Sequence, residues 1–182
     1  MRITGGILKG RTVEVPRSGR TVSGVIRPAM DRMRESVFGA LGDLSGQSFL
    51  DLFSGSGIIA LEAASRGANP VEAVEMDSVK RKTLIENVSL SPVRVQCHFI
   101  AVELYVRRAK KPFDIIFCDP PFPYKFKWEL AASIAASPLM AGGSRLLLHR
   151  PRQNAFEAPP EGLSFEESRT YGRSIVDFFK KN

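Results

Sequence analysis

Cysteine is scarce in this sequence, and long apolar runs are missing from it. Only Cys97 and Cys118 occur, each inside a strand-like apolar run, so we expect neither a disulfide framework nor a zinc site. No apolar run approaches the roughly 18 residues that span a membrane, and the first residues lack the apolar stretch of a signal peptide. These absences predict a soluble, cytoplasmic protein with no membrane contact and no bound metal.

The length and composition are those of a small globular protein. The chain has 182 residues, of which 43% are hydrophobic and 25% are charged, and these values are close to globular averages. That length suits one domain with a short extension and leaves little room for two full domains. We therefore expect one buried core. We also expect the protein to be a monomer.

Positive charge is concentrated near the N-terminus. The whole chain has a net charge of +7, and residues 1–34 contain eight basic and two acidic residues, a net charge of +6. Such a segment suits a polyanion such as RNA, although a solvated basic tail would look similar. We expect residues 1–26 to form a basic arm or hairpin and residues 27–182 to form the main domain. The candidate RNA contacts at this end of the chain are Arg2, Lys9, Arg11 and Arg27.

From residue 49 onward, short apolar runs alternate with segments of helical period. This alternation predicts an α/β fold with a mostly parallel sheet covered by helices on both faces. Two strand-like runs around residues 171–173 predict an antiparallel hairpin at the C-terminal end of the sheet. The expected strands are Phe49–Phe53, Val71–Met76, Val93–Phe99, Phe113–Cys118, Arg145–His149, Leu163–Thr170 and Ser174–Phe179. The expected helices are Asp31–Leu41, Ile58–Arg66, Ser78–Leu90, Val102–Lys110 and Lys127–Ala136.

A loop with two glycines follows the first expected strand. The segment Asp51-Leu-Phe-Ser-Gly55-Ser-Gly57 leads into a helix at Ile58. Glycine allows a tight turn and a close approach of the backbone to a ligand, and a helix N-terminus offers free N–H groups. The third glycine of the dinucleotide fingerprint is replaced by Ala60. Because the fingerprint permits this variant, the loop alone does not exclude NAD.

Two carboxylates distinguish between the possible ligands. Asp51 stands just before the loop, where it would repel a pyrophosphate and attract a cation. Glu75 follows Gly57 by 18 positions, near the spacing at which an acid binds ribose hydroxyls. A sulfonium group, an ammonium group and a ribose together describe S-adenosylmethionine. The alternative interpretation is an ordinary strand-to-helix turn with a surface acid.

A second motif, Asp119-Pro-Pro-Phe122, directly follows the fourth expected strand. Its two prolines fix the backbone and remove two N–H donors, which leaves a rigid loop rich in acceptors beside an aromatic ring. The Asp119 carboxylate and the Pro120 carbonyl can each accept one hydrogen of an exocyclic amine, while Phe122 stacks on the base. These contacts favour a pyramidal nitrogen whose lone pair points at a methyl carbon. The alternative interpretation is a purely structural turn.

Several other residues are given structural interpretations. His98 and His149 have no second ligand-type partner nearby in the sequence, so we interpret both as structural or surface residues. We interpret Trp128 and Phe126 as helix core. Tyr124 lies closer to the loop at residues 119–122, which we call the base loop, and it stays a candidate for contact with the substrate.

Over essentially its full length the chain resembles the RsmD family of 16S rRNA guanine-N2 methyltransferases. Two departures from the family pattern are Ala29, which stands in place of threonine, and Ile100, which stands in place of a polar residue. The matching segments are residues 1–6, 9–11, 27–35, 51–57, 61–63, 75–77, 87, 119–122 and 171–172.

The resemblance implies a Rossmann-like class I fold that binds S-adenosylmethionine, with a guanine of 16S rRNA in the small ribosomal subunit as the substrate. It implies a catalytic loop of Asp119, Pro120, Pro121 and Phe122. The residues assigned to the cofactor are Asp51, Phe53, Ser54, Gly55, Ser56, Gly57, Glu75, Met76, Ile100 and Ala101. The residues assigned to the RNA are Arg2, Lys9, Arg11, Arg27 and Tyr124.

Three other functions remain open. A DNA adenine-N6 methyltransferase would use a similar loop, but it usually needs a separate target-recognition region, for which this chain has little room. A nicotinamide-dependent oxidoreductase would leave the motif at residues 119–122 unexplained. A catalytically silent RNA-binding protein would not need an intact Asp119.

Overall fold

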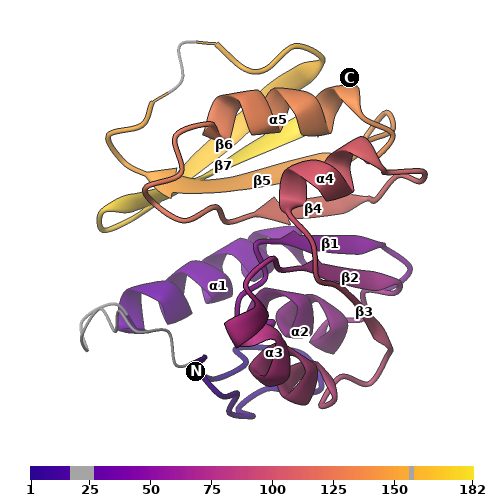
Figure 1. The fold of residues 1–182 in the computed structure, drawn as a ribbon. Coiled ribbons are helices and arrows are strands. Elements are labelled where there is room, and N and C mark those ends of the chain that lie inside the picture. The colour runs from indigo at the N-terminus through magenta and orange to yellow at the C-terminus, as the bar shows by residue number, and fades with distance from the viewer. Residues whose placement is uncertain (17–26, 156–157) are drawn as a thin grey trace.

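The computed structural model describes residues 1–16, 27–155 and 158–182, and for residues 27–29 it describes the backbone but not the side chains. Within these residues, seven strands form one sheet in the order β3-β2-β1-β4-β5-β7-β6 (Figure 1). The strands are β1 (Phe49–Leu52), β2 (Val71–Val74), β3 (Val95–His98), β4 (Ile115–Cys118), β5 (Arg145–Pro151), β6 (Leu163–Tyr171) and β7 (Ser174–Lys181).

The first five strands are parallel, and the last two form an antiparallel hairpin on one edge. β1 pairs in parallel with both β2 and β4, and β4 pairs in parallel with β5. β7 runs antiparallel to β5 and to β6. The chain therefore builds the sheet outward in both directions from β1, which creates a topological switch point between β1 and β4. In open α/β sheets, ligands bind outside the carboxyl ends of the strands at such a point.

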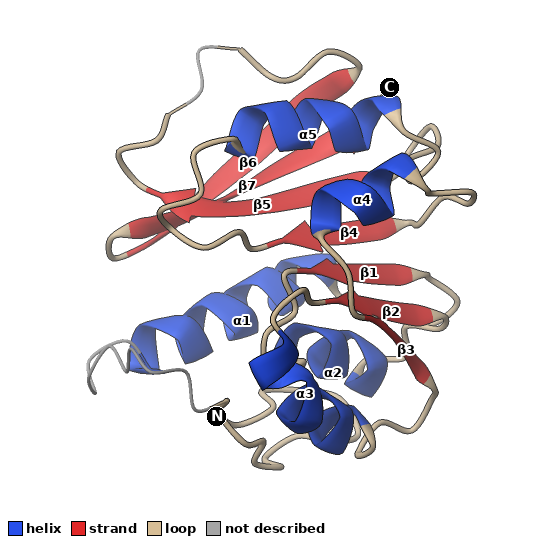
Figure 2. Ribbon diagram, in the orientation of Figure 1, coloured by secondary structure: helices blue, strands red, loops and turns tan. Residues whose placement is uncertain are grey.

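Helices cover both faces of the sheet (Figure 2). Helices α1 and α2, together with the N-terminal residues, pack against one hydrophobic core, and α4 and α5 pack against the other. None of the helices in the described residues is long and apolar enough to cross a membrane. The helices are α1 (Arg27–Leu41), α2 (Ile58–Ser65), α3 (Arg81–Val88), which follows a 3-10 turn at Ser78–Lys80, α4 (Val102–Arg107) and α5 (Lys127–Ala136).

The central strand shows why this sequence forms a doubly covered sheet. All four residues of β1 are buried. Phe49 belongs to the core under α1 and α2, whereas Leu50 and Leu52 belong to the core under α4 and α5. Side chains alternate between the two faces of a strand, so a strand that is covered on both faces reads as a continuous apolar run. The one polar residue of β1 is Asp51, and it leads into the functional site.

The expected α/β class, the parallel sheet and the C-terminal hairpin are confirmed. Several element ends differ from the expectation. The first helix begins at Arg27 rather than at Asp31, and the second strand ends at Val74 rather than at Met76. The helix that was expected over residues 78–90 is divided into a 3-10 turn and α3.

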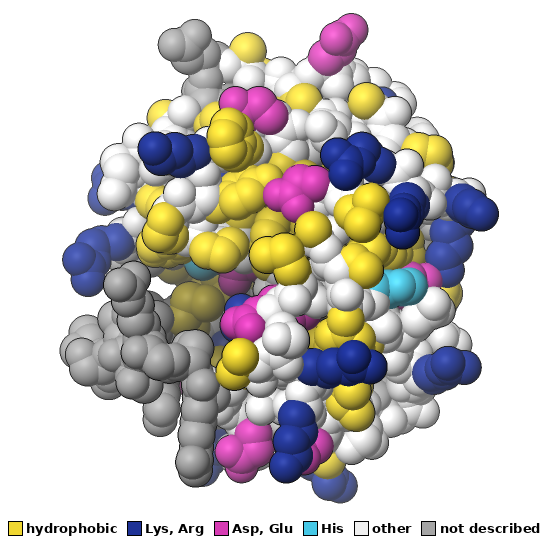
Figure 3. Space-filling model, in the orientation of Figure 1, with side chains coloured by type: hydrophobic (Ala, Val, Ile, Leu, Met, Phe, Trp, Pro, Cys, Tyr) yellow, Lys and Arg dark blue, Asp and Glu magenta, His cyan; other side chains and the backbone are white. Residues whose placement is uncertain are grey.

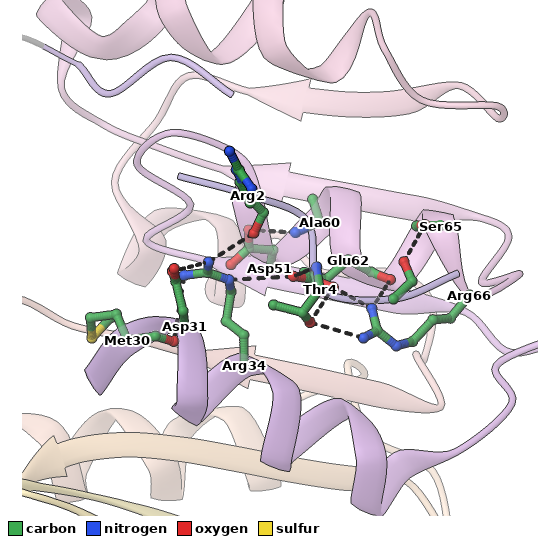
Figure 4. Close-up of polar contacts among 11 residues, drawn as sticks. Arg2, Thr4, Met30, Asp31, Arg34, Asp51, Ala60, Glu62, Ser65 and Arg66 are labelled. Atoms are coloured by element: carbon green, nitrogen blue, oxygen red, sulfur yellow. Dashed lines mark hydrogen bonds and ion pairs between the residues drawn. The ribbon is translucent and has the colours of Figure 1, made fainter. Parts of the chain in front are cut away.

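The first 16 residues pack closely on α2. Ile3, Leu8 and Val13 are buried in the core under α1 and α2. The Glu62 carboxylate accepts hydrogen bonds from the backbone N–H and the hydroxyl of Thr4, and it also forms ion pairs with Arg34 and Arg66 (Figure 4). Arg34 reaches further, to the carbonyl of Arg2 over 3.0 Å and to Asp31 over 2.5 Å. Residues 17–26 of the expected arm lie outside the described residues, so the boundary at residue 26 stays a prediction.

Candidate functional site

A cavity of about 820 Å³ lies at the carboxyl ends of the parallel strands. Its walls come from the segments that follow β1, β2 and β4, from β5 itself, and from α1 and α4. Figure 3 shows that hydrophobic side chains gather across the middle of the displayed face, with Lys and Arg side chains mostly around them. The residues that line the cavity are Met30, Phe53, Glu75, Met76, Asp77, Ser78, Lys80, Val102, Glu103, Asp119, Pro120, Pro121, Phe122, Tyr124 and His149.

The loop after β1 holds a strained backbone. Phe53 has a φ of 63°, and it is the one described residue other than glycine with a positive φ. Such a conformation costs roughly 1–3 kcal/mol and persists where surrounding contacts hold it. At Gly57 (φ of 81°) an added Cβ would lie 2.7 Å from Leu84 Cδ1. The glycine at position 57 is therefore required by the left-handed turn and by the packing of α3 against the loop.

Asp51 supports this loop from within the protein. Its side chain is 1% exposed, and its Oδ2 atom accepts hydrogen bonds from the Ser54 hydroxyl over 2.6 Å and from the Ala60 N–H over 3.2 Å. Burial raises the pKa of Asp51 to about 7, although both hydrogen bonds oppose the shift. Asp51 is not one of the residues that line the cavity. Its assigned contact with a cationic ligand stays a prediction.

Glu75 lies at the end of β2 and faces the cavity. One carboxylate oxygen accepts the Gly55 N–H over 2.8 Å, and the other accepts the Asp77 N–H over 2.8 Å. Lys80 lies 3.4 Å from the same carboxylate. Because a carboxylate offers about four acceptor positions, Glu75 can hold the loop at Gly55 and still accept hydroxyl groups from a ligand.

The structure places the other residues assigned to the cofactor in different surroundings. Phe53 and Met76 line the cavity, and Met76 is 68% exposed. Ser54 and Ser56 are buried in the loop. Gly55, Gly57 and Ala101 are not among the residues that line the cavity; Gly57 is the N-cap of α2 and Ala101 is the N-cap of α4. Ile100 lines a neighbouring cavity of about 410 Å³ together with Glu72, His98 and Tyr105.

The predicted base loop lines the same cavity as Glu75. Asp119, Pro120, Pro121 and Phe122 are all in its wall. The Asp119 N–H donates to the carbonyl of Leu52 over 3.2 Å, which ties the start of this loop to the end of β1. Phe122 is 50% exposed, so one side of its ring is free to contact a ligand. The two sequence motifs therefore meet at one cavity, as the switch-point rule requires.

Tyr124 also lines the cavity and is tied to α4. Its hydroxyl donates to Glu103 of α4 over 2.6 Å. Burial and this hydrogen bond raise the pKa of Tyr124 above its usual value. The ring packs edge-on against Phe53, with 5.6 Å between centroids. The interpretation of Phe126 as helix core is wrong, because Phe126 is 60% exposed just before α5 begins.

Several residues of the site were not identified from the sequence, and two of them contact the base loop. Lys127 has a side chain that is 1% exposed, and its ammonium group donates to the carbonyl oxygens of Phe122 and Tyr124. His149 is not a surface residue, since its side chain is 2% exposed and lies 2.7 Å from Asp119. A signal for His149 exists once the strand order is known. Cys118 pairs with Leu148 in parallel register, so the next residue on each strand lies beside the other.

The structure shows the surroundings of some, but not all, of the residues assigned to RNA. Arg2, Lys9 and Arg11 are exposed on the N-terminal segment. Arg27 begins α1, but its side chain lies outside the described residues. In the part of the chain that the structure describes, no group of three or more His, Cys, Asp or Glu side chains could hold a metal ion.

Comparison with known proteins gives matches over the whole chain. A family model described as "Conserved hypothetical protein 95" matches residues 1–180. The "Ribosomal RNA small subunit methyltransferase D" of Escherichia coli strain K12 is 28% identical over 183 residues, which cover 100% of this chain and 90% of the relative. The solved structure of the "Putative methyltransferase yhhF" from Escherichia coli has a TM-score of 0.87 at 26% identity and covers 100% of this chain and 98% of that one.

A more distant likeness concerns the fold alone. The crystal structure of magnesium protoporphyrin IX methyltransferase from Synechocystis PCC 6803, with bound SAM, has a TM-score of 0.68 at 16% identity. The match covers 86% of this chain and 82% of that one.

Proposed function

The chain belongs to the family described as Conserved hypothetical protein 95, the RsmD family, and on this premise we propose that it transfers a methyl group from S-adenosylmethionine to N2 of a guanine in 16S rRNA. One observation carries the proposal. Glu75 and Asp119, from two separate sequence motifs, line a single cavity at the switch point of the sheet. Cavities of about 300–1,000 Å³ are typical of small-molecule sites.

The charge of the cavity favours a cationic cofactor. Its wall carries four acidic side chains and one lysine, Lys80. A pyrophosphate would be repelled there, whereas a sulfonium and an ammonium group would be attracted. Glu75 would accept the ribose hydroxyls, and Phe53 and Met76 would pack against the apolar parts of the nucleoside. The acidic side chains are Glu75, Asp77, Glu103 and Asp119.

The base loop would supply the chemistry on the nucleotide side. S-adenosylmethionine provides an electrophilic methyl carbon when it is bound. Asp119 and the carbonyl of Pro120 would accept the two hydrogens of the exocyclic amine, and Phe122 would stack on the base. An amine lone pair that is freed from the ring would attack the methyl carbon in line as the bond between that carbon and sulfur breaks, and S-adenosylhomocysteine would leave. The carboxylate would stabilise the positive charge that develops on nitrogen until the extra proton passes to solvent. Most of the catalysis would therefore come from positioning and electrostatics.

The proposal is tested by giving the purified protein radiolabelled S-adenosylmethionine with three substrates: small ribosomal subunits, free 16S rRNA and duplex DNA. We expect label in 16S rRNA, and mass spectrometry of its nucleosides should identify N2-methylguanosine. The variant Asp119→Ala is the matched control and should bind the cofactor without transferring the methyl group. Label in adenine of the DNA would instead support the DNA adenine-N6 alternative, and no label in any substrate would contradict the proposal.

A second measurement addresses the cofactor separately. Calorimetry with S-adenosylhomocysteine should show binding that Glu75→Ala weakens by about 1–3 kcal/mol, the range for losing hydrogen bonds to a charged group. Tight binding of NAD in the absence of this binding would favour an oxidoreductase.

A further inference from the structure

His149 and Asp119 form a partly buried pair in the wall of the cavity. Asp119 follows β4 and His149 lies on β5, and the parallel register of these strands sets the two residues side by side. The His149 Nδ1 atom lies 2.7 Å from Asp119 Oδ1. The imidazole is 2% exposed, whereas the Asp119 side chain is 29% exposed. The histidine therefore stands behind the carboxylate, on the side away from solvent.

The chemistry of the two groups fixes which atom carries the proton. An ionised carboxylate only accepts hydrogen bonds, so Nδ1 must be the donor. His149 Nε2 is buried and has no hydrogen-bond partner among the described residues. Within the same residues, the contact with His149 is the one hydrogen bond that the Asp119 carboxylate accepts, and it uses Oδ1. Oδ2 is left for another donor.

The ring of His149 is also held by the base loop itself. Phe122 packs edge-on against the imidazole, with 5.8 Å between ring centroids. The imidazole thus contacts both the first and the last residue of the Asp119–Phe122 loop. A carboxylate without this support would be free to rotate away from the amine.

We propose that His149 is a positioning residue for the methyl transfer: its imidazole holds Asp119 Oδ1, so that Oδ2 is presented to the amine of the target base. This inference rests on the proposed function and adds a residue that acts through Asp119. It also predicts that the rate of methyl transfer depends on whether the imidazole of His149 is neutral or protonated. A neutral imidazole leaves the pair with the full negative charge of Asp119, whereas an imidazolium cancels that charge and weakens the stabilisation of the positively charged amine.

The groups around His149 determine the direction in which its pKa is shifted. Burial lowers the pKa of His149, but the charge and the hydrogen bond of Asp119 outweigh it, so the pKa lies above its usual value. The rate should therefore rise with pH as His149 loses its second proton. The other charged or titratable groups that line this cavity are Glu75, Asp77, Lys80, Glu103 and Tyr124, and on the neighbouring strand β7 Asp177 is paired with Arg150.

The test compares two substitutions of His149 with a matched control. His149→Phe removes the donor and keeps a ring, whereas His149→Asn can place an amide N–H near the position of Nδ1. His98→Asn is the control, because His98 forms a similar contact with a carboxylate, 2.6 Å from Glu72, outside this cavity. For each protein, kcat and KM are measured with small subunits across a pH range of about 5.5–8.5. This range extends about one unit or more on each side of the pKa of an ordinary histidine. Binding of S-adenosylhomocysteine is measured as well.

We expect His149→Phe to lower kcat by about 10- to 100-fold, the scale of a misplaced catalytic group, with unchanged affinity for S-adenosylhomocysteine. His149→Asn should recover part of kcat and should lose the low-pH limb of the wild-type profile. His98→Asn should change neither. A purely structural role would alter the melting temperature and not the shape of the pH profile. Wild-type kcat in His149→Phe, or an unchanged low-pH limb in His149→Asn, would overturn the inference.

A separate readout does not depend on the substrate. In an NMR titration of ring-labelled histidine, Asp119→Asn should lower the pKa of His149, because burial then acts without the opposing charge. An unchanged pKa would show that the pair is not formed. A wild-type protein that methylates nothing would instead overturn the proposed function, whereas an active wild type with an equally active His149→Phe variant would overturn this inference alone.

Discussion

The ammonium group of Lys127 donates to the carbonyl oxygen of Phe122 over 3.0 Å, from a side chain that is 1% exposed. It also donates to the carbonyl of Tyr124. Burial lowers the pKa of Lys127, and a buried cation that is held mainly by carbonyl oxygens costs free energy. We infer that the buried lysine is tolerated despite this cost because its hydrogen bonds fix the end of the base loop.

Replacement of Lys127 by methionine tests this role. Lys127→Met keeps the volume of the side chain and removes both donors, so the loop should lose its fixed position. We expect kcat to fall by roughly 10- to 100-fold while the affinity for S-adenosylhomocysteine stays the same. The free energy of unfolding should stay equal or rise, because an apolar group replaces a buried charge. The exposed Lys125→Met is the control, and equal kcat values in the two variants would refute the role.

A second prediction concerns the contact between the cofactor loop and the N-terminal segment. Asn87 donates to the carbonyl of Ser56 over 2.8 Å, and its side-chain amide also exchanges two hydrogen bonds with the backbone of Glu14. Asn87→Ala should destabilise the protein by about 1–3 kcal/mol, because buried polar groups lose their partners. It should also weaken binding of S-adenosylhomocysteine. Urea unfolding and calorimetry measure the two effects, with the exposed Gln153→Ala as control.

A third prediction concerns pH and stability. Burial raises the pKa of Asp51 from 3.8 to about 7, so the folded state binds a proton that the unfolded state releases. The resulting stabilisation is complete below pH 3.8 and is lost as the pH rises through about 7. Asp51→Asn cannot titrate, so its free energy of unfolding should fall less between these values than that of the wild type.

The control for Asp51 is Asp43→Asn. Asp43 is exposed, and hydrogen bonds from Ser45 lower the pKa of its carboxyl, so its contribution changes only at more acidic pH. The measurement is urea unfolding at several pH values between about 4 and 8, the interval around the two pKa values of Asp51. If the free energy of unfolding of Asp51→Asn changes with pH as steeply as that of the wild type, the proton bound by the folded state is not on Asp51.

Much of the fold can be predicted from the sequence because the strands are buried on both faces. β4 is a continuous apolar run, and β1 is interrupted only by Asp51. Such runs, ending in turn-forming residues, identify central parallel strands. The ends of the elements are predicted less accurately than their positions along the chain. Met76 was expected in a strand, but the last backbone contact of β2 with β3 is the bond from the Glu75 N–H to the His98 carbonyl.

The candidate site could be predicted only where its residues share a local motif. Asp119 and Phe122 stand in one tetrapeptide, and Glu75 stands at a fixed distance from the glycine loop. His149 belongs to the site only through the register of β5 beside β4. Lys127 does so because the loop folds back over its side chain. Such contacts depend on tertiary packing and leave no pattern in a single sequence.

The last prediction concerns the basic N-terminal segment and substrate binding. Deletion of this segment is a poor test, because Ile3, Leu8 and Val13 are part of the core and Thr4 is bound to Glu62. Neutralising exposed charges leaves that packing intact. We expect Lys9→Gln combined with Arg11→Gln to weaken binding to small ribosomal subunits and to reduce the slope of log affinity against log salt by about 2, one unit for each lost phosphate contact.

The matched control neutralises Arg152 and Arg173, which are also exposed and lie at the β6–β7 hairpin. This variant has the same net charge as the first, so a difference between the two reports the position of the charges. Binding of S-adenosylhomocysteine should be equal in both, since neither pair lines the cavity. Equal salt slopes in the two variants would mean that the N-terminal charges are merely solvated, and that another surface of the protein binds the RNA phosphates.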